Sequence, residues 1–362
     1  MKRKFNFSAG PSTLPVQVLE EIQREIVNYR GSGMSLIEAS HRGADYEAVH
    51  NECIENVRTL LEVPENYQIL LMGGGATLQF GMIPLNLLQF AAKERAADYV
   101  ISGVWAKKAH QDAQQLGATH IAYDGASTNY TTLPETLSLS QDPVYVHITS
   151  NETIGGLRWV DWPDTGEAPL ICDMSSDIMS RPIPVEKFGL IYAGAQKNLG
   201  PAGVTLVIVR DDILQSSPAQ LPAYLRYSVH AENNSLYNTP PVFSIYAMNL
   251  VLRWVKKQGG AKKMQELAEQ KAELIYSAVN ESEGFYTSPV DQKYRSLMNV
   301  VFQIADKTLD STFIEEAAKH GMVGLKGHRS VGGLRASLYN AMPVSGAEAL
   351  ADFMRSFATR RR

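Results

Sequence analysis

The chain has 362 residues, and its 34 lysines and arginines against 38 aspartates and glutamates give a formal net charge of −4. Hydrophobic residues make up 44% of the chain and charged residues 20%, proportions that exclude a largely disordered protein. The mild acidity argues against a general binder of nucleic acid or of an anionic membrane, because such proteins usually carry an excess of cations. At about 150 residues a domain, the length predicts roughly two domains.

The two cysteines, Cys53 and Cys172, have no CxxC spacing and no further cysteines with which to form a disulfide framework. We expect two buried, reduced thiols, as in a cytosolic protein. The basic N-terminus is not followed by an apolar stretch, so we expect no signal peptide. No run of about 18 apolar residues, the length that a membrane span requires, occurs. These features predict a soluble, cytoplasmic protein.

Helices are predicted first along the chain. Apolar residues at three- and four-residue spacing predict them over residues 15–30 and 45–62. Short apolar runs bounded by turn residues then alternate with helical or polar stretches, which is typical of buried strands. These runs are residues 67–72, 99–101, 119–122, 144–148, 170–172, 190–193 and 204–209. The alternation predicts an α/β fold with a mostly parallel central sheet.

The pattern of predicted helices and strands changes near Gly259-Gly260. A long helical pattern over residues 242–257 ends there, and a charged amphipathic helix is predicted over residues 262–279, followed by a strand over 299–304. Two segments have the spacing of capping boxes and predict further helix starts, namely Thr312-x-x-Glu315 and Ser345-x-x-Glu348. We therefore expect a smaller α+β domain in the last hundred residues.

A glycine-rich segment, residues 73–77 (Gly-Gly-Gly-Ala-Thr), lies between the strand ending at Met72 and a helix expected to begin near Leu78. Glycines let the backbone approach a ligand closely, and a helix N-terminus offers free N–H groups and the positive end of a dipole. This combination suits a phosphate group. The pattern is neither GxGxxG nor a P-loop, which disfavours NAD and ATP. A tight structural turn is the alternative interpretation.

Two further residues suggest a cofactor. Asp173 ends a predicted strand, and Lys197 lies 24 residues later (197 − 173) among small residues. A lysine with little access to water has a lowered pKa and can act as an amine nucleophile, while a carboxylate can keep a pyridine nitrogen protonated. With the glycine-rich segment, these residues point to pyridoxal phosphate. Taken singly, the three features also fit a turn, a helix cap and a surface lysine.

Five segments together resemble the phosphoserine aminotransferase family, which belongs to the class V aminotransferases and has the aspartate aminotransferase fold. They are residues 5–11 (Phe-Asn-Phe-Ser-Ala-Gly-Pro), the glycine-rich segment, 195–198 (Ala-Gln-Lys-Asn), 238–241 (Asn-Thr-Pro-Pro) and 327–329 (Gly-His-Arg). The resemblance implies a fold-type-I enzyme with a large domain and a small domain. The large domain, with a mostly parallel seven-stranded sheet, would span residues 16–258, and the small α+β domain residues 1–15 and 259–362.

The resemblance also implies how the chain would hold pyridoxal phosphate. Lys197 would bond to the cofactor covalently, and Asp173 would pair with its pyridine nitrogen. Further cofactor contacts are implied for Ala76 and Thr77 on the phosphate, the stacked ring of Trp105, the hydroxyl of Thr153, Gln196, and Asn238 with Thr239. In the family the last two reach the cofactor of the neighbouring subunit, which implies a homodimer. No metal is expected.

The resemblance assigns the substrate to five basic residues. Arg335 would hold the α-carboxylate, and the distal anion would be held by His41, Arg42, His328 and Arg329. An arginine fork matches the geometry of carboxylates and phosphates. The implied reaction is reversible transamination of 3-phosphohydroxypyruvate with L-glutamate, giving O-phospho-L-serine and 2-oxoglutarate in L-serine biosynthesis. Use of a second keto acid, in pyridoxine biosynthesis, is left open. Lys197 would move the proton as general base and acid, with ping-pong kinetics.

Three other functions fit the sequence less well. A cysteine desulfurase needs a reactive cysteine on a late loop, and no cysteine follows Cys172. Another class V transaminase, acting on small neutral amino acids, would have no use for basic pairs at residues 41–42 and 328–329. A non-catalytic protein that binds a phosphorylated metabolite would leave Lys197 and Asp173 unexplained.

Overall fold

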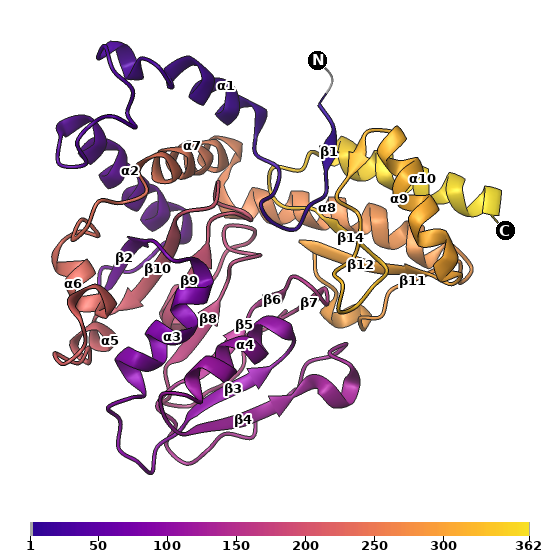
Figure 1. The fold of residues 1–362 in the computed structure, drawn as a ribbon. Coiled ribbons are helices and arrows are strands. Elements are labelled where there is room, and N and C mark those ends of the chain that lie inside the picture. Colours follow the sequence, from indigo (N-terminus) through magenta and orange to yellow (C-terminus); the bar gives the residue numbers. More distant parts are fainter. Residues whose placement is uncertain (1–2, 362) are drawn as a thin grey trace.

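The computed structural model describes residues 3–361, with helices packed around a large and a small sheet (Figure 1). The α-helices are α1 (Val16–Glu25), α2 (Ala44–Leu61), α3 (Gly75–Leu87), α4 (Val104–Ala113), α5 (Asp211–Gln215), α6 (Tyr227–Glu232), α7 (Val242–Gln258), α8 (Gly260–Asn280), α9 (Asp310–Lys319) and α10 (Val344–Arg361). The strands are β1 (Phe5–Asn6), β2 (Tyr67–Met72), β3 (Ala97–Ile101), β4 (Thr119–Asp124), β5 (Val146–Thr149), β6 (Asn151–Glu152), β7 (Leu157–Arg158), β8 (Leu170–Asp173), β9 (Phe188–Gly194), β10 (Thr205–Arg210), β11 (Tyr286–Thr287), β12 (Asn299–Ile304), β13 (Met322–Val323) and β14 (Leu334–Ser337).

The large sheet has seven strands in the order β2-β10-β9-β8-β5-β3-β4. Only β10 runs antiparallel to its neighbours β2 and β9, so the predicted mostly parallel sheet is confirmed. Successive residues of each strand face opposite sides. Ile69 and Leu71 of β2 therefore pack in one core with α2 and α7, and Leu70 and Met72 pack in another with α3 and α4.

The strand register places the residues that begin the functional loops along one edge of this sheet. Met72 pairs with Thr205, which pairs with Gly194. Asp173 pairs with Thr149 on one side and Tyr192 on the other. Because parallel strands end together at this edge, the loops that follow β2, β5, β8 and β9 start side by side, where ligands gather in open α/β sheets.

The small sheet, β11-β12-β14, is antiparallel and shares a core with α8, α9 and α10. The N-terminal segment belongs to this part of the molecule, because β1 pairs with β13 and Phe7 lies fully buried in the same core. Figure 1 shows β1 beside α10, although these elements are at opposite ends of the chain. The predicted domain limits, residues 16–258 against 1–15 and 259–362, stay a prediction.

Several predicted helix limits are wrong. The first helix ends at Glu25 rather than near residue 30, and α3 begins at Gly75 rather than near Leu78. Neither capping box exists, because Thr312 and Ser345 lie inside α9 and α10. For α9 the cause is a preceding 3₁₀ turn, which Asp306 starts by accepting the N–H of Thr308 at 3.0 Å. Within residues 3–361, no helix is both long enough and apolar enough to cross a membrane.

Candidate active site

Lys197 lies just after β9 and is brought to Thr153 and Asp173. Its Nζ donates a hydrogen bond to Thr153 Oγ1 at 2.6 Å. Burial lowers the pKa of Lys197, an effect that the carboxylate of Asp173 partly opposes. Burial likewise raises the pKa of Asp173, and the charge of Lys197 partly opposes it. A lysine whose pKa is lowered has a larger fraction of neutral amine, which is the nucleophilic form.

The N-terminal segment packs directly on this lysine. Gly10 has a φ of +145°, and a Cβ at this position would lie 3.3 Å from Lys197 Cγ. Ser12 donates its N–H to the carbonyl of Gln196 at 3.0 Å and its hydroxyl to the carbonyl of Lys197. The end of the segment at residues 5–11 that carried the resemblance, together with Ser12 directly after it, thus packs on the lysine and its backbone.

Thr153 also connects the lysine to Arg335. The Arg335 Nη1 donates to the Thr153 carbonyl at 3.0 Å, so one residue contacts the amine and the guanidinium. The Nε of Arg335 is buried and donates to no atom of the described residues 3–361. A buried donor without a partner is costly, and an incoming carboxylate would satisfy it. Arg335 therefore has a free donor that an α-carboxylate could use, and its predicted role in binding one stays a prediction.

Trp105 lies in the first turn of α4, and the Lys197 Nζ is 5.7 Å from the centroid of its ring. The ring is therefore next to the amine, as a predicted stacking partner for a bound pyridine requires. Gln196, the residue before Lys197, is half-buried. Its side chain folds over Gly194, where a Cβ would come within 2.7 Å of Gln196 Oε1.

The glycine-rich segment forms the N-terminus of α3. Gly74 has a φ of +91° at the N-cap position, and no side chain caps the helix. Ala76 and Thr77 lie in the first turn, so their N–H groups point out of the helix end. A Cβ built on Gly75 would meet no atom within 4 Å. Open space in front of uncapped amides fits a phosphate group.

The side chains at this edge fit pyridoxal phosphate as a set. They supply an amine of lowered pKa at Lys197, a buried carboxylate at Asp173, a hydroxyl at Thr153, an aromatic face at Trp105 and a free helix N-terminus at residues 75–77. Their roles toward the cofactor stay predictions.

The predicted distal-anion residues lie in two separate places. His41 and Arg42 precede α2, whereas His328 and Arg329 precede β14. In Figure 1 the segment between α1 and α2 is at the upper left, apart from β14, which lies right of the centre. Asn238 and Thr239 are exposed before α7. No hydrogen bond within residues 3–361 connects their side chains to Lys197 or Asp173.

His328 lies in a strongly cationic environment. Its Nδ1 and the Ser330 Oγ are 2.7 Å apart. Burial lowers the pKa of His328, and the charges of Arg335, Arg329 and Lys108 lower it further. Converging positive charge of this kind favours an anion.

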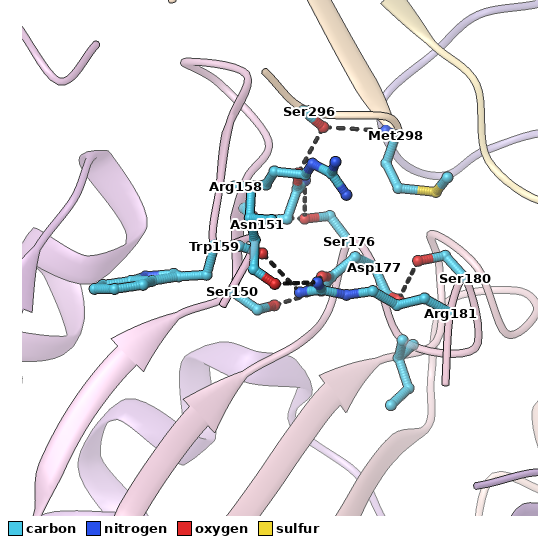
Figure 2. A network of polar contacts seen from close by, with 12 residues as sticks. Ser150, Asn151, Arg158, Trp159, Ser176, Asp177, Ser180, Arg181, Ser296 and Met298 are labelled. Carbon is cyan, nitrogen blue, oxygen red and sulfur yellow. Dashed lines mark hydrogen bonds and ion pairs between the residues drawn. The ribbon is translucent and has the colours of Figure 1, made fainter. Parts of the chain in front are cut away.

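A buried polar network joins the large sheet to the small one beside the site, as Figure 2 shows around Asn151. The Asn151 amide donates to Ser176 Oγ at 2.8 Å and to Asn299 Oδ1 at 2.9 Å, and its Oδ1 accepts from Ser296 Oγ at 2.5 Å. Ser176 belongs to the loop after β8, and Asn299 begins β12. Residues 151–153 are therefore held by the small sheet at one end and contact Lys197 and Arg335 at the other.

Two residues of this site were absent from the sequence-based prediction. Lys108 places its Nζ 4.7 Å from the centroid of the Trp105 ring, and its spacing of three from Trp105 on a helix could have suggested it. Glu152 is a buried acid directly before Thr153. Its only sequence signal is that position, because its partners lie on another element.

The comparisons with known proteins agree with this geometry. The model of the family "Aminotransferase class-V" matches residues 4–350. The chain belongs to the class-V aminotransferase family. It is 51% identical to the phosphoserine aminotransferase of Niallia circulans over 98% of each chain. A solved phosphoserine aminotransferase from Bacillus circulans subsp. alkalophilus superposes with a TM-score of 0.97 at 50% identity, covering 100% of both chains.

A more distant solved structure, phosphoserine aminotransferase from Trichomonas vaginalis with pyridoxal phosphate bound, superposes with a TM-score of 0.92 at 39% identity. It covers 98% of this chain and 100% of that one. These matches confirm the resemblance inferred from the sequence, the predicted fold and the predicted kind of enzyme, a transaminase that uses pyridoxal phosphate.

Proposed function

We propose that this class-V aminotransferase catalyses the reversible transamination of 3-phosphohydroxypyruvate with L-glutamate, which gives O-phospho-L-serine and 2-oxoglutarate in L-serine biosynthesis. The observation that carries the proposal is the contact of Thr153 with both Lys197, at 2.6 Å, and Arg335, at 3.0 Å. This contact holds an amine of lowered pKa next to a half-buried guanidinium whose Nε is buried. The relatives of about 50% identity are named phosphoserine aminotransferases, which supports the substrate.

Each residue has a part in this reaction. The chemistry that pyridoxal phosphate supplies when bound is an electron sink for the bonds at the substrate Cα. Arg335 holds the α-carboxylate and thereby orients the Cα–H bond toward Lys197. The neutral amine of Lys197 would take the proton from the substrate Cα and deliver it to C4′ of the cofactor. Asp173 stabilises positive charge on the pyridine nitrogen, and Trp105 covers one face of the ring and excludes water.

We further propose that the site is completed by a second copy of the chain. The segment before α2, with His41 and Arg42, and the segment before β14, with His328 and Arg329, lie apart in one protomer (Figure 1), and an interface between two copies would bring them together. Large apolar side chains are exposed in the same segments, namely Val27, Met34, Ile37, Tyr237 and Val331. Exposed apolar groups of this kind mark association surfaces. Asn238 and Thr239 then reach the partner's cofactor.

A substrate panel tests the function. With L-glutamate as amino donor, turnover of 3-phosphohydroxypyruvate is expected to exceed that of unphosphorylated hydroxypyruvate at least about 100-fold, because charge-assisted bonds to the phosphate are lost. Equal rates would favour a transaminase for small neutral amino acids and contradict the proposal. A protein that neither binds pyridoxal phosphate nor turns over either substrate would favour a non-catalytic binder.

Mixing inactive variants tests the shared site. Lys197→Ala and the double variant Asn238→Ala/Thr239→Ala are each expected to be nearly inactive. If the sites are shared between protomers, mixed dimers contain one intact site, so up to about a quarter of wild-type activity returns after statistical exchange. Absence of rescue, after subunit exchange has been demonstrated with labelled chains, would contradict a shared site.

A further inference from the structure

Glu152 is a buried carboxylate for which the proposed reaction has no use. The residue is 1% exposed and ends the short strand β6, directly before Thr153. A carboxylate removed from water needs hydrogen-bond donors. Apart from the Ser102 hydroxyl, which donates to Oε1 at 3.4 Å, the donors to Glu152 within residues 3–361 come from α4, the helix that carries Trp105.

The donors are the first free amides of that helix. Glu152 Oε1 accepts the N–H of Ala106 at 3.2 Å, and Oε2 lies 3.5 Å from the amide nitrogen of Trp105. Gly103 occupies the N-cap position and has no side chain with which to bind these amides. A Cβ on Gly103 would lie 2.5 Å from Glu152 Cδ. Glu152 thus replaces the usual N-cap side chain of α4.

The capped turn determines where the Trp105 ring lies. The indole Nε1 is buried and has no hydrogen-bond partner within residues 3–361, so no hydrogen bond of the ring itself fixes its plane; its only charged contacts in this part of the chain are the Lys108 and Lys197 ammonium groups, at 4.7 and 5.7 Å from the ring centroid. The ring is placed by the backbone of the first turn and by packing. Through Glu152, this turn is attached to the strand that continues into Thr153, the partner of Lys197.

We propose that Glu152 is a positioning residue, which caps α4 with its ionised carboxylate and so fixes the plane of the Trp105 ring against the bound cofactor. It does not touch the reacting atoms. The proposal rests on the predicted pyridoxal phosphate site, and it assigns to Glu152 a role that the predicted site residues do not include.

The capping depends on the charge of the carboxylate. Burial, with a smaller contribution from Asp173, raises the pKa of Glu152 to about 7, although the two amides and Lys197 oppose the shift. Tyr130 is also close to Glu152, and burial, Asp124 and then Glu152 raise the pKa of that tyrosine. Near and below pH 7 Glu152 gains a proton, and the amides lose a charged acceptor. The cofactor is therefore held less tightly as the pH falls through about 7.

The test uses purified holoenzyme and Glu152→Gln, which keeps the shape of the side chain and removes its charge. At pH 8 we expect the Kd for pyridoxal phosphate to rise about tenfold, the size of a lost charge-assisted hydrogen bond. The visible circular dichroism of the bound cofactor should weaken, while far-ultraviolet dichroism stays unchanged. Between pH 8 and 6, wild-type affinity should show a decrease that the variant lacks. Lys197, Asp173 and Tyr130 are present in both proteins, so the difference between the two pH profiles of affinity reports on Glu152.

Two controls make the result specific. Ser102→Ala removes only a hydroxyl 3.4 Å from Glu152 Oε1, and its affinity should stay within about twofold of wild type. In a Trp105→Ala background, Glu152→Gln should add less than about twofold, because the ring through which it acts is absent.

The proposal is overturned if Glu152→Gln binds the cofactor with wild-type affinity and dichroism, or if its tenfold effect persists without Trp105. If Glu152→Gln does not fold, Glu152→Asp replaces it. That shorter carboxylate should weaken cofactor binding while keeping the pH-dependent decrease, and wild-type affinity would overturn the proposal. Failure of the wild-type protein to bind pyridoxal phosphate would instead contradict the proposed function.

Discussion

Two lysines lie in different regions of the molecule and are used in opposite ways. Lys197, at the edge of the large sheet, is half-buried, whereas Lys271, on α8 beside the small sheet, is fully buried. Lys271 on α8 donates to three backbone carbonyls, those of Leu338 and Tyr339 at 2.8 Å and of Met342 at 3.1 Å. All three N–H bonds of its ammonium are thus used. Lys197 has one hydroxyl partner at 2.6 Å and a carboxylate nearby.

The difference shows what separates a structural cation from a reactive amine. Burial lowers the pKa of both lysines, so a lowered pKa alone does not identify the catalytic one. An amino group held by three backbone carbonyls is fixed in place and cannot move to a substrate. An amine held by a single hydroxyl can leave it and react.

The largest expected effect follows from removing the reactive amine. Lys197→Ala should lower kcat about 10⁴-fold or more, because it removes both the nucleophile and the general base, while thermal stability changes little. Borohydride reduction of the wild-type holoenzyme should bleach its visible absorption and label Lys197, as peptide mapping would show. Recovery of the label on Lys271 would contradict the assignment.

Removing the structural cation should have the reverse outcome. Lys271→Met leaves the carbonyls of Leu338 and Met342 without a donor and should reduce the free energy of unfolding by about 3 kcal/mol, measured by urea titration. The kcat of the folded fraction should stay within about twofold of wild type. The control is Lys263→Met, because Lys263 is exposed on the same helix and pairs with Glu266. This variant should change the free energy of unfolding by less than about 0.5 kcal/mol. A large loss of kcat in Lys271→Met would contradict the distinction between a structural Lys271 and a reactive Lys197.

A smaller expected effect is the contribution of Lys271 to the pH dependence of the free energy of unfolding. Burial lowers the pKa of Lys271 to about 7, and an unfolded lysine has a pKa of about 10.4. Between these values the unfolded chain binds more protons than the folded one, so this lysine makes stability rise with pH, by at most about 1.4 kcal/mol per pH unit. Below pH 7 the lysine is protonated in both states and contributes no slope. Unfolding of wild type and Lys271→Met between pH 7 and 10 should show this slope only in the wild type; equal slopes would contradict it.

Sequence reasoning found the central residues of the site because their signals are local. Asp173 and Lys197 each follow an apolar strand, and parallel strands carry such residues to one edge. Glu152 gave no such signal, since its partner Ala106 is 46 residues away on α4. Lys271 was part of a helix predicted as charged and amphipathic, and its burial depends on carbonyls 67 to 71 residues further along.

The helix starts were predicted less well for a related reason. A capping box describes a contact between a side chain and a backbone N–H only when the chain enters the helix at that residue. At Thr312 the preceding 3₁₀ turn had already begun the helical path. The separation of the two basic pairs on one protomer was equally hidden, because it depends on how distant segments are arranged.

Three consecutive residues have separate tasks, with Asn151 bound to the small sheet, Glu152 capping α4, and Thr153 contacting Lys197 and Arg335. This arrangement limits how the enzyme can be redesigned. A substitution that shifts any of the three moves the other two through one short piece of backbone, so improved binding of a new substrate would come with weaker cofactor binding. Substitutions intended to change the substrate are better made at residues 327–333, which lie outside residues 151–153.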